Sequence, residues 1–121
     1  MSTDAFRLDG KHAVVTGGAS GIGQAIALAF GSRGAAVHIL DLDKDAAGIT
    51  AQQILDEGGA ALAYACDVAE KAAVDRTFDE VMDRGGIDLL INNAGVGRWR
   101  TLMETSPEEG VDMIGDRKSV V

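Results

Sequence analysis

The stretch TGGASGIG, residues 16–23, lies between two apolar segments of different periodicity. The segment before it, residues 12–16 (HAVVT), is short and rich in β-branched residues, which predicts a strand buried on both faces. The segment after it, residues 23–32, has apolar residues at helical spacing and predicts a helix. The glycines allow a tight turn and close approach to a ligand, and the helix N-terminus offers free N–H groups. This context favours a pyrophosphate-binding loop over a ligand-free turn.

The spacing of the glycines distinguishes this loop from other phosphate loops. A Walker loop needs Lys and then Ser or Thr after its last glycine, but here Gln24 and Ala25 follow Gly23. The G-x-G-x-x-G pattern is also absent, and the sequence follows T-G-x-x-x-G-x-G instead. Phosphoryl transfer is therefore disfavoured.

Strand-like and helix-like segments alternate along the rest of the chain. The order predicts an α/β fold, a Rossmann-like doubly wound parallel sheet that is incomplete, with connectivity β-α-β-α-β-α-β-α and strand order 3-2-1-4. Further strands are expected at residues 36–40, 60–65 and 87–91, and helices at residues 43–57 and 67–84.

Two of the helix starts have capping signals. Asp67 and Glu70 have capping-box spacing, which predicts that the helix at 67–84 begins there. Ser106, Pro107 and Glu109 stand at the N-cap, N1 and N3 positions of a final predicted helix.

Composition and charge disfavour several classes of function. The net charge of −8 makes nucleic acid and anionic membrane poor partners. The single cysteine, Cys66, cannot form an intrachain disulfide or a metal cluster, and its place after an apolar strand predicts a small buried thiol. His12 and His38 are isolated in the sequence and lack metal-ligand spacing. With no signal-peptide pattern and no membrane-length apolar run, a cytoplasmic protein is expected.

Asp41 ends the second predicted strand, where a carboxylate can accept hydrogen bonds from ribose hydroxyls and repel a 2′-phosphate. A solvated or helix-capping aspartate is the alternative. Asp67-Val68 follows the third strand, and Asn92-Asn93-Ala94-Gly95 follows the fourth. Taken alone, the last segment would be only a turn, but after a parallel strand it lies at the ligand edge of the sheet.

These four motifs, in this order, resemble the classical short-chain dehydrogenase/reductase family from about Lys11 to Gly115. The resemblance implies an oxidoreductase that transfers a hydride between NAD(P) and an alcohol or carbonyl substrate, within a homotetramer or homodimer. It implies NAD rather than NADP, because the places where NADP users carry a basic residue hold Ala19, Ser20 and Leu42. The residues that it assigns to the cofactor's diphosphate are Gly17, Ser20, Gly21, Ile22 and Gly23.

The resemblance also assigns the adenosine half of the cofactor. It places Asp41 at the adenosine ribose, Asp67 at the adenine amino group and Val68 beside the adenine ring. The capping role of Asp67 stays open beside this one, since its side chain can cap while its backbone meets adenine. Asn93, Ala94 and Gly95 are assigned to the adenosine ribose and to the central sheet.

The family's catalytic Ser, Tyr and Lys have no match in this sequence. The one tyrosine, Tyr64, has Val68 where the Tyr-x-x-x-Lys pattern needs lysine. We therefore expect no catalytic residue in the chain as given, and binding of NAD(H) at most. A stand-alone nucleotide-binding module without catalysis is the alternative, and an isomerase or dehydratase on the same fold is a third hypothesis.

The last residues depart from the family's pattern. Met113-Ile114-Gly115 matches the start of the family's Met-Ile-x-Val-Asn segment, but Arg117 stands where Asn would fall. The codons GAT CGG AAG AGC GTC GTG would translate to residues 116–121, and this string resembles the start of a common sequencing adapter. We therefore expect a truncated NAD(P)-binding Rossmann-type domain at residues 1–115 and a non-native tail at residues 116–121, with a natural truncated paralogue as the alternative. The fourth strand would then be an unpaired apolar edge that favours association.

Overall fold

Strands and helices alternate through the described part of the chain, which is residues 7–93 and 119–120 of the computed structural model. The predicted strand at residues 12–16 and the one at residues 60–65 are confirmed in full. The elements are β1 (His12–Thr16), α1 (Gly21–Ser32), β2 (Ala36–Asp41), α2 (Lys44–Asp56), β3 (Ala60–Ala65), α3 (Lys71–Asp83), β4 (Leu89–Asn92) and β5 (Ser119–Val120).

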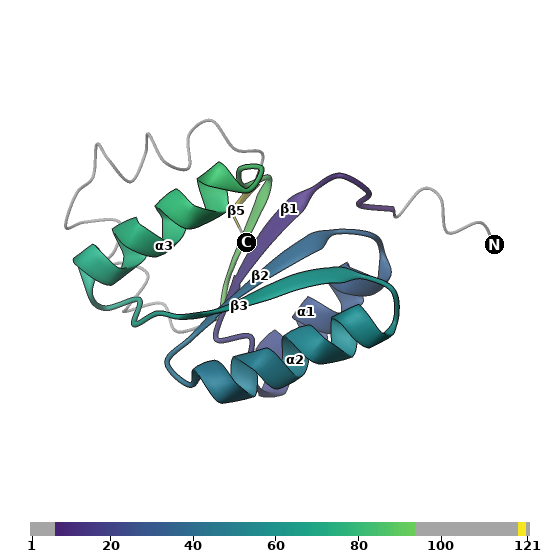
Figure 1. The fold of residues 1–121 in the computed structure, drawn as a ribbon, viewed down its shortest axis with the longest axis horizontal. Helices are drawn as coiled ribbons and strands as arrows, with labels where there is room; N and C mark the ends of the chain where they lie inside the picture. The colour runs from purple at the N-terminus through teal and green to yellow at the C-terminus, as the bar shows by residue number, and fades with distance from the viewer. Residues whose placement is uncertain (1–6, 94–118, 121) are drawn as a thin grey trace.

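The strands form one parallel sheet in the order β3-β2-β1-β4-β5 (Figure 1). The predicted order 3-2-1-4 is confirmed, but the expectation that β4 is an unpaired edge is wrong. Leu89 and Leu90 pair with Ser119 and Val120 of β5. The reason is that a strand edge presents N–H and C=O groups that any extended segment can satisfy.

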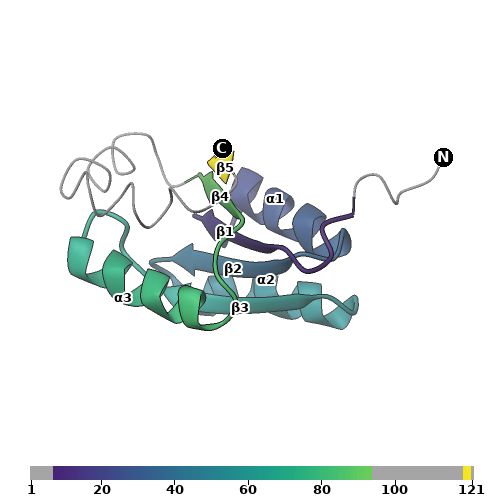
Figure 2. The ribbon, with the colours of Figure 1, turned by 90° about the horizontal axis from the view of Figure 1, so that it is seen from above.

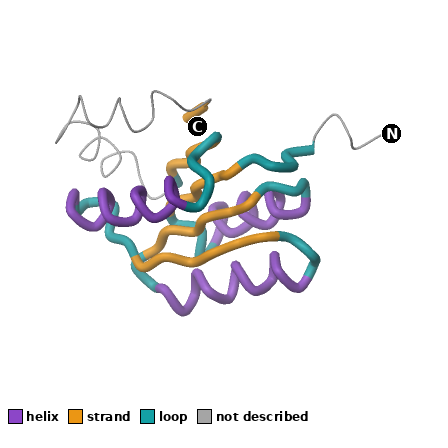
Figure 3. Tube along the Cα trace, turned by 45° about the horizontal axis from the view of Figure 1, so that its top comes forward, coloured by secondary structure: helices purple, strands orange, loops and turns teal. Residues whose placement is uncertain are grey.

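Helices cover both faces of the sheet. Helices α1 and α2 lie on one face and α3 on the opposite face (Figures 1 and 2), and the tube in Figure 3 shows the sheet between these two layers. Successive residues of a strand point to opposite faces, so each buried strand supplies two cores. Val15 and Ile39 pack in the cluster beside α1 and α2, whereas Val14 and Leu40 pack with Phe78 beside α3.

The ends of two helices differ from the predicted ones. Helix α1 begins at Gly21, so the last glycines of the loop already form its first turn. Helix α3 begins at Lys71 with Glu70 as N-cap, and the prediction that it starts at Asp67 is wrong. The carboxylate of Asp67 instead accepts a hydrogen bond from Ala69 N at 2.9 Å, which closes a turn before the helix.

Strand β4 also begins later than predicted, at Leu89, because Asp88 bonds to the start of β1. Its carboxylate accepts a hydrogen bond from His12 N at 2.9 Å, and its own N–H donates to His12 O at 2.8 Å. These two bonds fix the entry to β4 against the start of β1.

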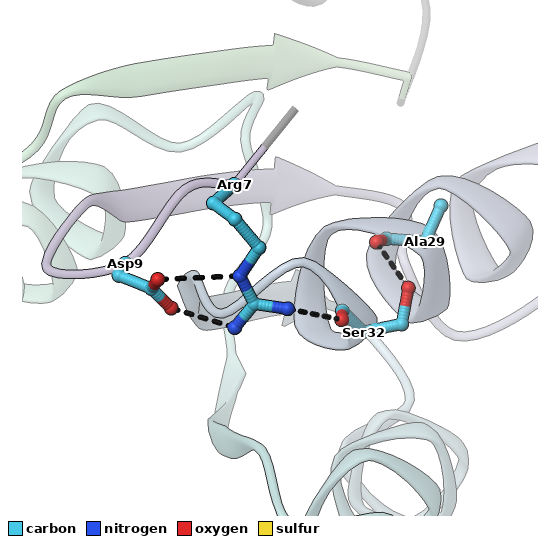
Figure 4. A network of polar contacts seen from close by, with 4 residues as sticks. All are labelled: Arg7, Asp9, Ala29 and Ser32. Atoms are coloured by element: carbon cyan, nitrogen blue, oxygen red, sulfur yellow. Dashed lines mark hydrogen bonds and ion pairs between the residues drawn. The ribbon is translucent and has the colours of Figure 1, made fainter. Parts of the chain in front are cut away.

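The segment before β1 is attached to the end of α1 (Figure 4). Arg7 makes two hydrogen bonds to the Asp9 carboxylate, of 2.7 and 3.2 Å, and reaches the carbonyl of Ser32 at 3.4 Å. The Arg7 guanidinium also lowers the pKa of Asp9. A cation beside the last carbonyls of a helix complements its dipole. Among the described residues, no helix is both long and apolar enough to cross a membrane.

Candidate functional site

The carboxyl ends of the parallel strands bring the predicted site residues to one edge of the sheet. Gly17 follows β1, Asp41 ends β2, Asp67 follows β3 and Asn93 follows β4. The chain passes from β3 on one side of β1 to β4 on the other side. The crevice where the strand order reverses is the usual ligand site of an open α/β sheet.

The glycine loop turns sharply between β1 and α1. Gly17 and Gly21 have φ angles of 67° and 59°, in the left-handed region that a side chain would strain. Ser20, the N-cap of α1, is extended and makes no side-chain capping bond. The first intrahelical bond runs from Gln24 N to Ser20 O at 3.2 Å, so helix geometry leaves the preceding N–H groups without an acceptor inside α1. The first turn also carries no acidic residue, and this end of the helix therefore suits an anion.

Gly23 is the point where the loop, α1 and the end of β4 meet. It is buried, and a Cβ built on it would press into the carbonyl oxygen of Gly17 and the side-chain nitrogen of Asn93. Asn93 Nδ2 donates a hydrogen bond of 3.1 Å to that same Gly17 oxygen. Only glycine fits this position without movement of the loop.

Thr16 connects β1 to β4 beneath the loop. Its side chain is buried, and Oγ1 accepts a hydrogen bond of 3.0 Å from Asn93 N. The single hydroxyl hydrogen has two possible acceptors, Ile91 O and Asn92 Oδ1, each 3.3 Å from Oγ1. Thr16 belongs to the quoted glycine pattern, but sequence reasoning gave it no role, and Asn92 was likewise missed.

Asp41 lies within hydrogen-bond reach of the glycine loop. Its Oδ2 accepts from Ala19 N at 3.2 Å, and its Oδ1 accepts from Asp43 N at 3.0 Å. The neighbouring Leu42 is 61% exposed. The contact with Ala19 was not predicted, since nothing in the spacing of the glycines indicates which loop N–H faces the strand end.

The adenine-side residues are placed differently from one another. The carboxylate of Asp67 is turned to Ala69 N, as described above, while Val68 is buried in the core cluster beside α3. Ala94 and Gly95 lie outside the described residues, as do the helix predicted from Ser106 and most of the predicted tail.

A second polar network lies away from this edge. His12 Nδ1 is 3.0 Å from His38 Nε2, and His38 Nδ1 is 2.9 Å from Tyr64 Oη. The two histidines were treated as isolated, but parallel register puts His12 and His38 on one face of neighbouring strands, and this signal could have found them. Burial, together with the charges of His12 and Arg84, lowers the pKa of His38 from its usual 6.5 to about 4.

Cys66 is buried, as predicted, and its burial raises the pKa of the thiol. In residues 7–93, no three side chains of the metal-ligating types come together. Beside the edge strand β3 there is a cavity of about 380 Å³, and a second of about 330 Å³ shares Leu62 and Arg84 with it. Neither cavity is lined by a residue predicted for the cofactor site.

The parallel sheet, its order and the glycine loop at the switch point define a Rossmann-like α/β protein. The family model for short chain dehydrogenases matches residues 11–116. The chain therefore belongs to the short-chain dehydrogenase family, as the sequence motifs predicted.

Individual relatives cover most of this chain. It is 46% identical over 105 residues to D-threitol dehydrogenase from Mycolicibacterium smegmatis, an alignment covering 86% of the chain and 40% of that protein. Its fold is similar to that of a 7 alpha-hydroxysteroid dehydrogenase complexed with NADH and 7-oxo glycochenodeoxycholic acid, with a TM-score of 0.77 and 28% identity, over 96% of this chain and 51% of that one. It is also similar to a metagenomic short-chain oxidoreductase in complex with NADP, with a TM-score of 0.79 and 28% identity, over 93% and 61%. The chain spans about 40% of the length of the curated relatives that it matches.

Proposed function

We propose that the chain binds a nicotinamide dinucleotide along the carboxyl edge of its sheet, as part of an oxidoreductase acting on an alcohol or carbonyl group. One observation carries this proposal. The N-terminus of α1 and the carboxylate of Asp41 lie at the same edge of the sheet, and Asp41 accepts a hydrogen bond of 3.2 Å from Ala19 N, in the loop that leads into α1. A dinucleotide carries a diphosphate next to a ribose diol, which is the pair of groups that an anion-binding helix end beside a carboxylate can hold.

The loop has room for such a ligand. A Cβ built on Gly21 would meet nothing within 4 Å, so the loop is open on that side, whereas Gly23 is closely packed on the side facing the protein. Ile22, at the same helix end, is 74% exposed. The diphosphate residues in this proposal are Gly17, Ser20, Gly21, Ile22 and Gly23.

The adenosine half would lie across β2, β3 and β4. Asp41 would accept hydrogen bonds from the ribose hydroxyls, and Asp67 and Val68 would border adenine. Asn93, with Ala94 and Gly95, would hold the ribose side and the central strands. When bound, the nicotinamide supplies the hydride acceptor or donor, while the residues of this chain bind and orient the cofactor.

We propose NAD rather than NADP as the cofactor. A 2′-phosphate on the adenosine ribose would face the Asp41 carboxylate, and like charges at short distance repel. The surrounding positions Ala19, Ser20 and Leu42 bring no positive charge. Relatives of known structure include complexes with either cofactor, so this preference rests on the residues of this chain.

The test is a fluorescence titration of the chain with NADH and with NADPH. We expect NADH to bind about 10- to 100-fold more tightly than NADPH, which is the range for the loss of one hydrogen bond to a charged group. Asp41→Ser should lower the ratio of NADH affinity to NADPH affinity about tenfold, because the repulsion between the carboxylate and the 2′-phosphate is removed. Equal affinities in the unmodified chain would overturn the NAD preference, and no binding of either cofactor would overturn the site.

A further inference from the structure

We propose that Asp41 is also a positioning residue, which holds the glycine loop in its diphosphate-binding shape whether or not a ribose is present. This inference rests on the proposed function, because it concerns the same cofactor site. Besides the proposed contact with ribose, the carboxylate of Asp41 would hold the backbone of the loop through Ala19 N.

The loop is attached to the sheet at three places. Gly17 N donates to Leu40 O at 2.7 Å, and Gly17 O accepts from Asn93 Nδ2 at 3.1 Å, so the start of the loop is held by β2 and β4. The middle of the loop is held by the hydrogen bond from Ala19 N to Asp41 Oδ2. Ala19 lies between Gly17 and Gly21, which both have a positive φ. Glycines give a backbone wide conformational freedom, so a bond between them restricts the loop.

Asp41 is itself fixed before any ligand arrives. Its second oxygen accepts from Asp43 N, and its backbone carbonyl accepts from Cys66 N at 2.9 Å. The first of these bonds orients the carboxylate, and the second holds the main chain of Asp41 at the end of β2. Because Asp41 is fixed in this way, its bond to Ala19 N holds the loop in a defined position relative to the end of β2.

The two tasks of Asp41 do not exclude each other. An ionised carboxylate has about four lone-pair sites on its two oxygens. The N–H groups of Ala19 and Asp43 use two of them, which leaves acceptor capacity for ribose hydroxyls.

The two tasks predict opposite results for a ligand without ribose hydroxyls. If Asp41 only contacts ribose, removing its negative charge should leave the binding of a diphosphate unchanged or make it tighter. If Asp41 positions the loop, the same change should weaken diphosphate binding, because the loop must be ordered when the ligand binds.

The experiment measures binding of ADP and of 2′,3′-dideoxy-ADP to the 121-residue chain and three variants. In Asp41→Ala we expect binding of 2′,3′-dideoxy-ADP to weaken about fivefold, the effect of one net hydrogen bond. Asp41→Asn keeps the shape and one acceptor oxygen, so a smaller loss of the same sign is expected. Asp43→Asn is the matched control, because it removes the same charge two residues away while asparagine still caps α2, and it should change the affinity less than about twofold. Unchanged or tighter binding of 2′,3′-dideoxy-ADP by both Asp41 variants would overturn the positioning role.

A second readout needs no nucleotide. Hydrogen exchange of the Ala19 amide should become about tenfold faster in Asp41→Ala than in the unmodified chain or in Asp43→Asn. Equal exchange in all three would overturn the inference. If neither ADP nor the dideoxy compound binds the unmodified chain, the proposed function fails, and the exchange of Ala19 still decides whether Asp41 holds the loop.

Discussion

Two polar networks cross the sheet, and they use their hydrogen-bonding groups in different ways. At the carboxyl edge, the side chains of Thr16, Asp41 and Asn93 bond to backbone groups of the glycine loop and of the strand ends. Within strands β1, β2 and β3, the side chains of His12, His38 and Tyr64 bond to one another. The first network shapes a loop and leaves the N–H groups of α1 available to a ligand, whereas the second uses its groups internally and holds three strands together.

This contrast explains why glycines gather at one network and rings at the other. The glycine loop packs against the side chain of Asn93 and has no space for a Cβ at Gly23. The side chains of His12, His38 and Tyr64 instead lie across one face of three neighbouring strands, with the His12 and His38 ring centres 5.3 Å apart. In the function that we propose, the first region binds the cofactor, and we expect the second to contribute to stability.

The largest effect that we predict is the pH dependence of the second network. The pKa of His38 is about 4 in the folded protein, so the unfolded chain takes up the proton first, near pH 6.5. The contribution of His38 to the free energy of unfolding should therefore fall by up to about 3 kcal/mol as the pH drops from about 6.5 to 4, and change no further below pH 4. Urea unfolding at several pH values measures it.

The variant His38→Phe serves as the control for that experiment. It removes the titrating group and leaves the carboxylates that also respond to acid. Its stability should depend less steeply on pH between 6.5 and 4 than that of the unmodified chain. Parallel curves for the two proteins would show that the buried histidine does not set the acid response.

The next effect concerns the close contact at Gly23. In Gly23→Ala the new methyl group would press into Gly17 O and Asn93 Nδ2, which should cost about 1–3 kcal/mol of stability and weaken NADH binding at least about tenfold. Gly48→Ala is the matched control, since a Cβ there meets nothing within 4 Å in helix α2, and it should stabilise the chain by up to about 1 kcal/mol. Thermal unfolding and NADH titration compare the two variants. Similar behaviour of both would contradict the packing described for the loop.

A smaller effect separates two buried threonines. Thr16→Val removes the hydroxyl that accepts from Asn93 N, and we expect it to cost about 1–2 kcal/mol of stability. Thr50 is equally buried, but its hydroxyl has no hydrogen-bond partner among the described residues. Thr50→Val should therefore be neutral or stabilising by up to about 1 kcal/mol. Chemical unfolding of both variants checks this, and an equal loss in each would mean that the Thr16 network adds no stability of its own.

The fold was predictable because each element has a local signal. The apolar run at residues 12–16 and the glycines that follow it fix β1 and the turn after it, and the alternation of periods gives the parallel sheet. The start of α3 was not predictable from the spacing of Asp67 and Glu70, since the same carboxylate can close a turn or cap a helix.

The candidate site was only partly predictable, for a different reason. The positions of Gly23 and Asp41 follow from local motifs and strand ends. The bonds of Thr16 to β4 and of Asp41 to Ala19 join residues far apart in the sequence, and they depend on register and side-chain direction. The pairing of His12 with His38 was partly predictable, because the predicted order makes their strands neighbours, but the register that puts the two side chains on one face comes from the structure.

An NMR titration of the ¹⁵N-labelled chain with NADH shows whether the cofactor binds at the first network or at the second. We expect the amides of Gly17, Ala19, Gly21 and Asp41 to shift together as NADH is added, while those of His38 and Tyr64 stay in place. Shifts confined to His38 and Tyr64, or no shifts at all at saturating NADH, would show that the cofactor does not bind at the glycine loop.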